Sequence, residues 1–495
     1  MKNNKILITI LAACILVSCN KFLDTLPDRR TELDTPDKIA KMLVSAYPTD
    51  YPVMMFELMS DNVTDNGPLF RPSTIKVEEA YLYKNVLGTG RTDRDCSARV
   101  WQNIYKNIAS ANQALEALDK LGNPAGTEGI RAEALLCRAF GHFVLVNAFC
   151  IAYNPESSNT DMGIPYMEAP ETTVNPVYTR GTVAGVYEKI NADIEAALPL
   201  VNDTYLDQPK YHFNRRAAYA FAARFNLFYG KWAKVVTYAT EAIGENPRPI
   251  LRDAVPYTQN ATVQTRMFAY ISLDQHCIFL AMTQTSNWGL IHVEPSQRYS
   301  MNTRMSHNTL QQYFPWGGMA NGYVIYGDQS VYYPKIRQIT DGGQTYVIFM
   351  AFTADETLAC RAEAYAMLGR FDDAARDLSH WYWRNGNRTF SKEEINVYYS
   401  IERNRSPRYP MASRFNMEPG MQENLVRAAL AIRRLEGVHS GYRWLDVKRH
   451  GITINRPVLK SQTEADTIKL LPYSNLTAIQ LPEDVIYAGL PANPR

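Results

Sequence analysis

A group of aromatic and polar residues in the middle of the sequence has the composition of a binding site. The rings are Trp288, Tyr299, Tyr313, Trp316, Tyr323, Tyr326, Tyr332 and Tyr333, and the polar groups among them are Asn287, Arg298, Asn302, Asn321 and Asp328. Sugar rings present flat apolar faces and a rim of hydroxyl groups, so a sugar site needs aromatic platforms with polar groups at their edges. The segment therefore indicates ligand binding, with Trp288, Trp316 and Tyr326 as the expected stacking residues. The alternative is that these rings form the core of their own lobe.

A second polar cluster lies nearer the amino terminus. Asp61, Asn62, Asp65 and Asn66 fall in the segment 61–72, DNVTDNGPLFRP, which its glycine and prolines predict to be a loop. Part of the cluster resembles the start of a calcium-binding loop, but Ser73 stands where the bidentate glutamate is required. No metal site is therefore predicted.

Enzymatic chemistry is not indicated. The sequence has no GxSxG, HExxH or P-loop motif. Asp372 and Asp373 are adjacent on an expected helix and diverge by about 100°, so they cannot flank a scissile bond. We interpret the charged stretch 443–448 as structural, with Arg434 and Arg443 paired to Glu436, Asp446 or Glu363 inside the scaffold. No catalytic residue and no cofactor is expected.

The charge balance argues against a polyanionic partner. The 495 residues include 52 basic and 50 acidic residues, a formal net charge of +2, so nucleic-acid binding is not indicated. Aromatic residues make up 11% of the chain, with 31 tyrosines, whose apolar face and hydroxyl suit recognition of sugars or peptides.

The amino terminus has the features of a secretion signal. Lys2 and Lys5 precede an apolar run over residues 6–17, which is too short to span a bilayer as a mature helix. The run ends in Leu-Val-Ser-Cys at 16–19, which resembles a bacterial lipobox. In such lipoproteins the cysteine is acylated, so residues 1–18 are predicted to be removed and Cys19 to carry the lipid anchor. The alternative is an ordinary signal peptide with a chance cysteine.

The remaining cysteines carry no readable metal or disulfide pattern. Five follow Cys19, namely Cys96, Cys137, Cys150, Cys277 and Cys360, and there is no CxxC or Cys/His ligand spacing. Their odd number argues against a complete disulfide framework. Cys137 and Cys360 lie in apolar helical stretches, where we expect them to act as small buried hydrophobic residues.

Two helical hairpins must provide the frame that positions the aromatic segment. In 358–381, apolar residues recur at three- and four-residue spacing on both sides of Gly369, which permits a left-handed turn. The segment 219–243 repeats this arrangement around Gly230. Small residues on the facing helices and a turn between them are typical of tetratricopeptide repeats. Two copies predict stacked hairpins with other sequence inserted between them.

The rest of the chain divides around these hairpins. Helices are predicted near 35–47, 100–121, 131–149, 182–198, 215–243, from 354, and at 424–435. The segments 154–176, 246–353 and 385–420 are predicted to be irregular, with short strands near 277–280 and 346–349. The tail is predicted to hold edge strands around 470–472 and 480–482. We therefore expect an amino-terminal helical region over 19–245, a loop-rich ligand-binding lobe over 246–353 and a carboxy-terminal helical region over 354–495.

The order of several motifs resembles the SusD/RagB family of Bacteroidetes outer-membrane lipoproteins. The motifs are the lipobox; Trp101, Tyr105, Asn112 and Glu116; AEAL at 132–135 with RAF at 138–140 and Phe143; GIPY at 163–166; RAEAY at 361–365; RRLE at 433–436; GYRWLDVKR at 441–449; and the closing LPE at 481–483 and NPR at 493–495. The resemblance covers nearly the whole mature chain.

The resemblance implies a mainly α fold of tetratricopeptide-like hairpins with a loop-rich insert lobe. It also implies a lipid-anchored, surface-exposed protein of the outer membrane that captures glycan as the lid of a SusC-like TonB-dependent barrel. In that family the early loop can line the pocket, which adds Asp61 and Asn66 to the expected ligand contacts Trp288, Trp316, Tyr326, Tyr299, Tyr323, Arg298 and Asn287.

Other functions are consistent with the same residues. A RagB-like protein would bind peptide for a peptide importer, and a structural adaptor would bind no nutrient at all. An endo-acting glycosidase would release products from a polysaccharide, which we do not expect. The identity of the ligand is not encoded in any readable motif.

Overall fold

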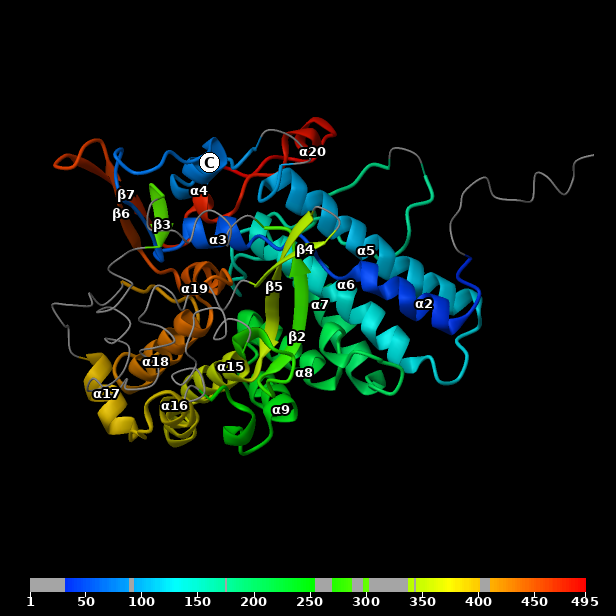
Figure 1. Ribbon diagram of the computed structural model, residues 1–495. Helices are drawn as coiled ribbons and strands as arrows, with labels where there is room; N and C mark the ends of the chain where they lie inside the picture. Colours follow the sequence, from blue (N-terminus) through cyan, green and yellow to red (C-terminus); the bar gives the residue numbers. More distant parts are fainter. Residues whose placement is uncertain are drawn as a thin grey trace, which may run out of the picture.

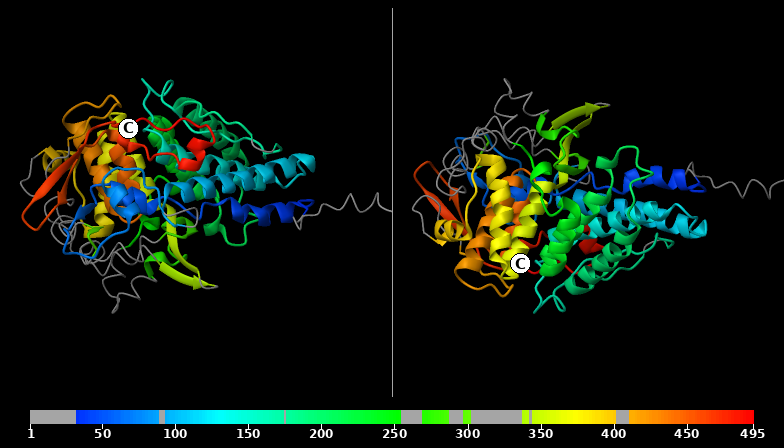
Figure 2. Two further views of the ribbon diagram at one scale, coloured as in Figure 1. Left: turned by 90° about the horizontal axis from the view of Figure 1, so that it is seen from above. Right: turned by 90° about the horizontal axis from the view of Figure 1, so that it is seen from below.

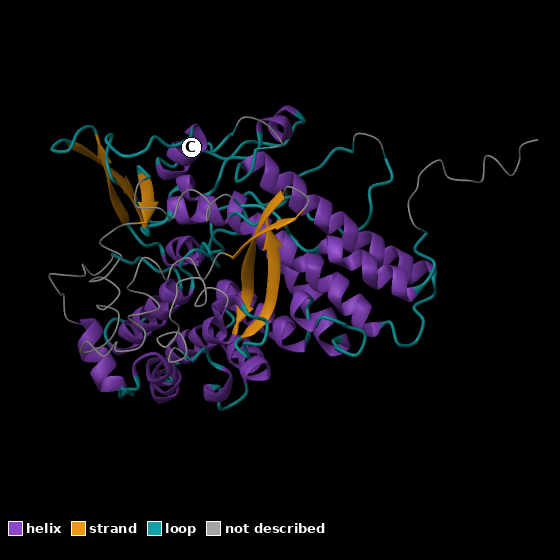
Figure 3. Ribbon diagram, in the orientation of Figure 1, coloured by secondary structure: helices purple, strands orange, loops and turns teal. Residues whose placement is uncertain are grey.

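The chain folds into a mainly helical protein with a few short sheets (Figures 1 and 3). The computed structural model describes residues 32–88, 93–173, 176–253, 269–286, 297–301, 337–341, 344–400 and 410–495. Its helices include α2 (Pro36–Met42), α3 (Val53–Met59), α4 (Ile75–Tyr81), α5 (Ser97–Lys120), α6 (Glu128–Phe149), α7 (Val183–Ala197), α8 (Arg215–Tyr229), α9 (Trp232–Ile243), α15 (Ala354–Met367), α16 (Phe371–Gly386), α17 (Lys392–Ser400), α18 (Met421–Glu436), α19 (Tyr442–His450) and α20 (Glu483–Tyr487). The predicted fold class is thereby confirmed.

Three long helices, α5, α6 and α7, lie side by side at one end of the molecule (Figure 1). The central helix, α6, is long and apolar enough to cross a membrane, but its apolar stretch is entirely buried in the fold. Its phenylalanines pack against rings from α8: Phe140 and Phe143 both make edge contacts with Phe221. This helix therefore lies at the centre of the helical core.

The two predicted hairpins are confirmed and stack on each other. Gly230 ends α8 and has a φ of 71°. Gly369 lies in the turn between α15 and α16 and has a φ of 73°. Helix α15 packs against both α8 and α9. Arg361 of α15 forms a fully buried ion pair with Asp377 of α16, and it also donates to the Gly244 carbonyl at the end of α9, at 2.8 Å. One guanidinium thus ties the two hairpins together. The helices of the two hairpins lie side by side in the views of Figure 2.

The two turn glycines allow a matched test of this packing. Both have left-handed backbones, so alanine at either position should cost about 1 kcal/mol from backbone strain alone. A Cβ at Gly369 would meet nothing within 4 Å, whereas one at Gly230 would lie 2.9 Å from the Phe415 ring, which packs edge-on against Trp232. We expect Gly230→Ala to cost about 1 kcal/mol more than Gly369→Ala in urea unfolding. Equal losses would contradict the tight fit at Phe415.

Within the described residues, the strands form three small antiparallel sheets. They are β1 (Val63–Asp65) with β3 (Tyr299–Met301); β2 (Ile278–Gln284), β5 (Gln344–Thr353) and β4 (Arg337–Asp341) in the order β2-β5-β4; and β6 (Ile454–Leu459) with β7 (Ala465–Leu470). The strands predicted near 277–280 and 346–349 are β2 and β5. The sheet connects to the scaffold because β5 leads directly into α15, whose N-cap is Thr353.

Two predictions about strands were wrong. Segment 61–72 was expected to be loop only, but it contains β1, which pairs with a strand far away in the sequence. Residues 480–482 were expected to be an edge strand, but they form no strand. Instead Gln480 exchanges hydrogen bonds with the Asn493 backbone, and Leu481 is buried. The predicted strand around 470–472 is the end of β7, so it stops at Leu470.

A chain of ion pairs runs through the interior where α8, α15, α18 and α19 meet. It consists of Arg224, Glu356, Arg433, Asp446, Arg449 and Glu363, each paired with its neighbour in this order. All six side chains are at most 2% exposed, and three guanidinium groups balance three carboxylates. This network confirms the structural interpretation of the charged stretch 443–448.

The five cysteines that follow Cys19 are all buried, and within the described residues they form no disulfide. Cys137 acts as a small core residue of α6, as predicted. Cys360 is less apolar than expected, because its thiol contacts Glu356 Oε1 at 3.2 Å and the Arg433 guanidinium at 2.9 Å.

Candidate functional site

The β1–β3 pair brings together the two polar clusters that the sequence singled out. Asp65 lies opposite Tyr299 in the ladder, and Val63 lies opposite Met301. The Asn66 side chain donates to the Gln297 carbonyl at 3.0 Å and to Ser300 Oγ at 2.9 Å. Asn66, Arg298 and Tyr299 therefore lie in one place although more than 200 positions separate them in the sequence.

Arg298 and Asp65 form the centre of this junction. Arg298 donates two hydrogen bonds to the Asp65 carboxylate, at 3.0 and 3.1 Å, and a third to the Leu459 carbonyl at the end of β6. Asp65 also accepts from the backbone N–H of Leu459 at 2.9 Å and of Gly67 at 2.8 Å. The pair therefore clamps β1, β3 and β6 together, and Arg298 keeps only a partly exposed edge, at 23%.

Tyr299 is buried at the same junction. Its ring stacks on Tyr81 with centroids 4.6 Å apart, and only 1% of the residue is exposed. Tyr81 is itself fixed, since its hydroxyl donates to the Pro457 carbonyl and accepts from the Asp65 N–H. This placement favours a packing role for Tyr299 over stacking on a ligand.

Asp61 is engaged with the scaffold. Its carboxylate accepts two hydrogen bonds from Arg443, at 2.7 and 2.9 Å, and lies 3.2 Å from Arg434 NH1. Burial acts to raise the pKa of this carboxyl, but Arg434 and Arg443 hold it well below its usual range. The predicted partners of Arg434 and Arg443 were therefore wrong.

The three acids predicted for those arginines are engaged elsewhere. Asp446 and Glu363 belong to the interior ion-pair chain, and Glu436 accepts from the Trp381 indole. The reason is position along α18 and α19: Arg434 and Arg443 reach the turn after α3, whereas Arg433 and Arg449 reach α15.

The remaining predicted ligand contacts lie outside the described residues. They are Asn287, Trp288, Trp316, Tyr323 and Tyr326, as well as the predicted lipidation site Cys19. Asn287 and Trp288 directly precede residues 297–301 along the sequence, within 287–296, and the other three rings follow them, within 302–336.

The loop after β1 carries a ring that the sequence analysis missed. Phe70 is 40% exposed and Leu69 is 75% exposed, next to the junction with β3. The loop is held there because the Arg298 N–H donates to the Arg71 carbonyl at 3.1 Å. Phe70 could have been noticed as an aromatic residue in a proline-rich stretch, because such a segment cannot bury its side chains in a helix.

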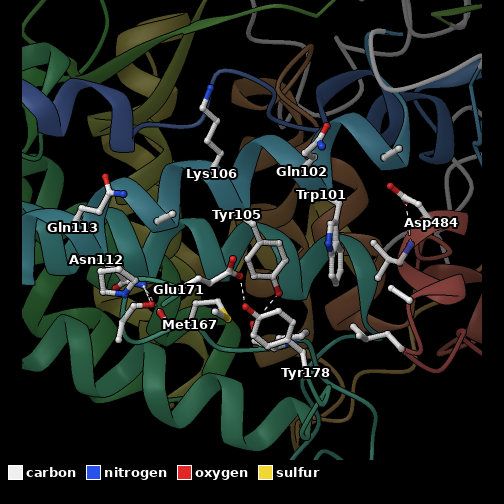
Figure 4. Close-up of a pocket in the computed structure, with 18 residues that line it drawn as sticks. Trp101, Gln102, Tyr105, Lys106, Asn112, Gln113, Met167, Glu171, Tyr178 and Asp484 are labelled. Atoms are coloured by element: carbon white, nitrogen blue, oxygen red, sulfur yellow. Dashed lines mark hydrogen bonds between the residues drawn. The ribbon is translucent and has the colours of Figure 1, made fainter. Parts of the chain in front are cut away.

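A groove of about 690 Å³ runs along α5 (Figure 4). Its walls are α5, the segment around 165–178, and α20 with the residues after it. It is lined by Ala98, Trp101, Gln102, Tyr105, Lys106, Ala109, Asn112, Gln113, Pro165, Met167, Ala169, Pro170, Glu171, Tyr178, Asp484, Val485, Ala488 and Leu490. This volume is in the range of pockets that hold small ligands, roughly 300–1,000 Å³.

The wall formed by 165–171 is rigid although it has no regular structure. Tyr105 donates to the Pro165 carbonyl at 2.8 Å, and Asn112 donates to the Met167 carbonyl at 3.0 Å. His142 accepts from the Met167 N–H at 3.0 Å, and Arg138 donates to the Glu168 carbonyl at 3.0 Å. Helices α5 and α6 therefore hold this wall in place, and the groove is preformed.

Comparison with known proteins places the fold. Residues 21–227 match the model of a SusD-like family described as starch-binding and associating with the outer membrane. No protein with a curated description matches the sequence. The similar solved structures include a SusD-like carbohydrate binding protein from Bacteroides vulgatus, with 16% identity, 93% of this chain and 97% of that chain covered, and a TM-score of 0.63.

Two further structures agree. A SusD superfamily protein from Bacteroides thetaiotaomicron has 17% identity, covers 94% of this chain and 100% of its own, and has a TM-score of 0.62. One from Bacteroides fragilis has 18% identity, covers 93% and 99%, and has a TM-score of 0.64. At these identities the likeness establishes the fold, and it extends over 93–94% of this chain.

Proposed function

We propose that this chain, which matches a SusD-like family model at 21–227, captures glycan at the outer membrane and delivers it, as a lid, to a SusC-like TonB-dependent transporter. The observation that supports this most is the family match at 21–227, joined to a fold that follows carbohydrate-binding relatives over nearly the whole chain. In this proposal a lipid on Cys19 holds the protein on the outer face of the membrane.

The β1–β3 junction is the proposed base of the glycan site. The segments that contain Trp288 and Trp316 flank β3 in the sequence, and the described residues at this junction include the exposed ring of Phe70 and the partly exposed Arg298. Rings with guanidinium and amide groups at their edges are the combination that a sugar face and its hydroxyls require. The buried clamp of Asp65 and Arg298 supplies the rigid support that such a site needs.

Calorimetry on the purified full-length chain tests the glycan proposal. We expect binding to at least one of a panel of polysaccharides and none to a matched panel of peptides. Trp288→Ala and Trp316→Ala should each weaken glycan binding about tenfold, about 1.4 kcal/mol, because each removes a stacking platform. Tyr211→Ala, which removes a 40% exposed ring from the 3-10 helix Pro209–Tyr211, should leave the affinity unchanged.

The partner is tested separately by co-purification with the outer-membrane barrel. The two tryptophan variants should retain the barrel, because they alter only ligand contacts. Tight binding of peptides with no response to any glycan would instead support a RagB-like peptide binder. Retention of the barrel by a protein that binds neither class would support a structural adaptor.

A further inference from the structure

The groove along α5 has two chemically different edges. Counting along the helix, Ala98, Trp101, Tyr105, Ala109 and Asn112 recur at three- and four-residue spacing and form the inner edge. Gln102, Lys106 and Gln113 line the groove from the outer edge of the same helix and are exposed. Figure 4 shows the rings of Tyr105 and Tyr178 on the inner side and the Lys106 chain on the outer side.

The polar side chains of the two edges differ in whether they already have hydrogen-bond partners within the described part of the chain. On the inner edge they are already engaged, since the Tyr105 hydroxyl and the Asn112 amide bind carbonyls of the opposite wall, and the Tyr178 hydroxyl binds Glu171. On the outer edge, the side chains of Gln102, Lys106 and Gln113 make no hydrogen bond or ion pair within the described part of the chain. A ligand in the groove therefore meets ring faces on one side and free donors on the other.

We propose that this groove is a second glycan-binding site, separate from the one at β3, which takes a linear oligosaccharide lying along α5. The apolar faces of the sugars lie against Tyr105, Tyr178 and the edge of Trp101, and their hydroxyls face Gln102, Lys106 and Gln113. The inference rests on the proposed function only for the class of ligand, because the groove shares no residue with the β1–β3 junction.

The free amides favour a sugar over an apolar protein segment. A buried apolar side chain would leave two amides and an ammonium at the edge without partners, and removing such groups from water without hydrogen bonds is unfavourable. An oligosaccharide supplies a hydroxyl at each of these positions. The rigid wall at 165–171 removes the need to order a loop on binding, which favours a flexible ligand such as a glycan chain.

Titration of the purified full-length chain tests this site. The probes are maltoheptaose, cellohexaose, xylohexaose and mannohexaose, measured by calorimetry for the number of binding events and their affinities. Ala109→Arg puts a long charged side chain into the groove, and Tyr178→Ala removes a ring from it. We expect each to abolish one binding event, or to weaken it at least about tenfold, and to leave the other unchanged.

Two control variants distinguish contact from misfolding. Ser110→Arg introduces the same side chain on the next residue of α5, which does not line the groove, and Tyr178→Phe keeps the ring without its hydroxyl. Both should bind as the wild type does. If Ala109→Arg and Tyr178→Ala bind the probes as the wild type does, the second site is overturned and the proposed function is unaffected.

The remaining outcomes also decide the question. Failure of the wild type to bind any of the four probes would overturn the second site, whereas the proposed function is decided separately by the panel of polysaccharides. Loss of the barrel from Ala109→Arg in co-purification, with glycan binding intact, would overturn the inference and assign the groove to a protein partner.

Discussion

Replacing Glu356 by glutamine is expected to lower the free energy of unfolding by about 3–5 kcal/mol, or to prevent folding altogether. Glu356 is 1% exposed and lies between Arg224 and Arg433, which are 2% and 0% exposed. The neutral amide would leave two guanidinium groups in the interior with one carboxylate fewer. Urea unfolding followed by circular dichroism measures the loss.

We expect Glu356→Gln to destabilise the fold because its ion pairs are buried. Breaking an exposed ion pair should therefore have a much smaller effect on the unfolding free energy. Lys41→Gln breaks the pair with Asp37, in which the two side chains are 76% and 72% exposed, and should leave the unfolding free energy nearly unchanged. If Glu356→Gln were no more costly than Lys41→Gln, the interior chain of ion pairs would not be a unit that holds α8, α15 and α18 together.

Acid sensitivity gives a second readout for the same residue. Burial acts to raise the pKa of Glu356, but Arg224 and Arg433 lower it from its ordinary value of 4.5 to about 2. A depressed carboxyl pKa contributes stability that is complete above pH 4.5 and is lost as the pH falls towards 2. The wild type should therefore lose this contribution over that interval, and Glu356→Gln should lack it.

Local sequence rules were sufficient for the helical hairpins. Gly230 and Gly369 marked turns that the structure confirms, and Thr35 and Thr182 capped the helices that were expected to follow them. These signals work because a cap or a left-handed turn depends on residues a few positions away. The stacking of α15 on α8 and α9 was expected because the hairpin pattern occurs twice in the sequence.

Partners far apart in the sequence could not be predicted in this way. Arg434 and Arg433 are neighbours on α18, yet one reaches Asp61 and the other Glu356 and Asp446. Successive residues on a helix point about 100° apart, so one position decides which partner is met. Nothing near Asp61 in the sequence shows that α18 and α19 pack on the turn that contains it.

The groove along α5 was missed for a related reason. Its walls come from three separated segments, and the segment at 165–171 was correctly expected to be irregular. Irregular sequence gave no hint that Asn112, His142 and Arg138 would fix that wall. The unused signal was the row of Gln102, Lys106 and Gln113 beside Trp101 and Tyr105, which places free polar groups next to rings on a single helix.

Replacing Asp61 by asparagine is expected to lower the free energy of unfolding by about 3 kcal/mol, because it leaves Arg434 and Arg443 buried with a neutral partner. Those side chains are 2% and 3% exposed, and each reaches Asp61 from a different helix. A direct ligand contact at Asp61 would instead predict normal stability and weakened glycan binding. Urea unfolding and calorimetry on the same sample separate the two roles.

A matched carboxylate and a double-mutant cycle complete the test of Asp61. Asp372→Asn removes a carboxylate that is 85% exposed and should cost less than about 0.5 kcal/mol. Arg443→Gln should also destabilise, but its combination with Asp61→Asn should cost clearly less than the sum, because each change has already removed the shared ion pair. Additive losses would mean that Asp61 stabilises the fold through Arg434 alone. A normal unfolding free energy for Asp61→Asn would return this residue to the ligand site, since its carboxylate would then be available for a sugar hydroxyl.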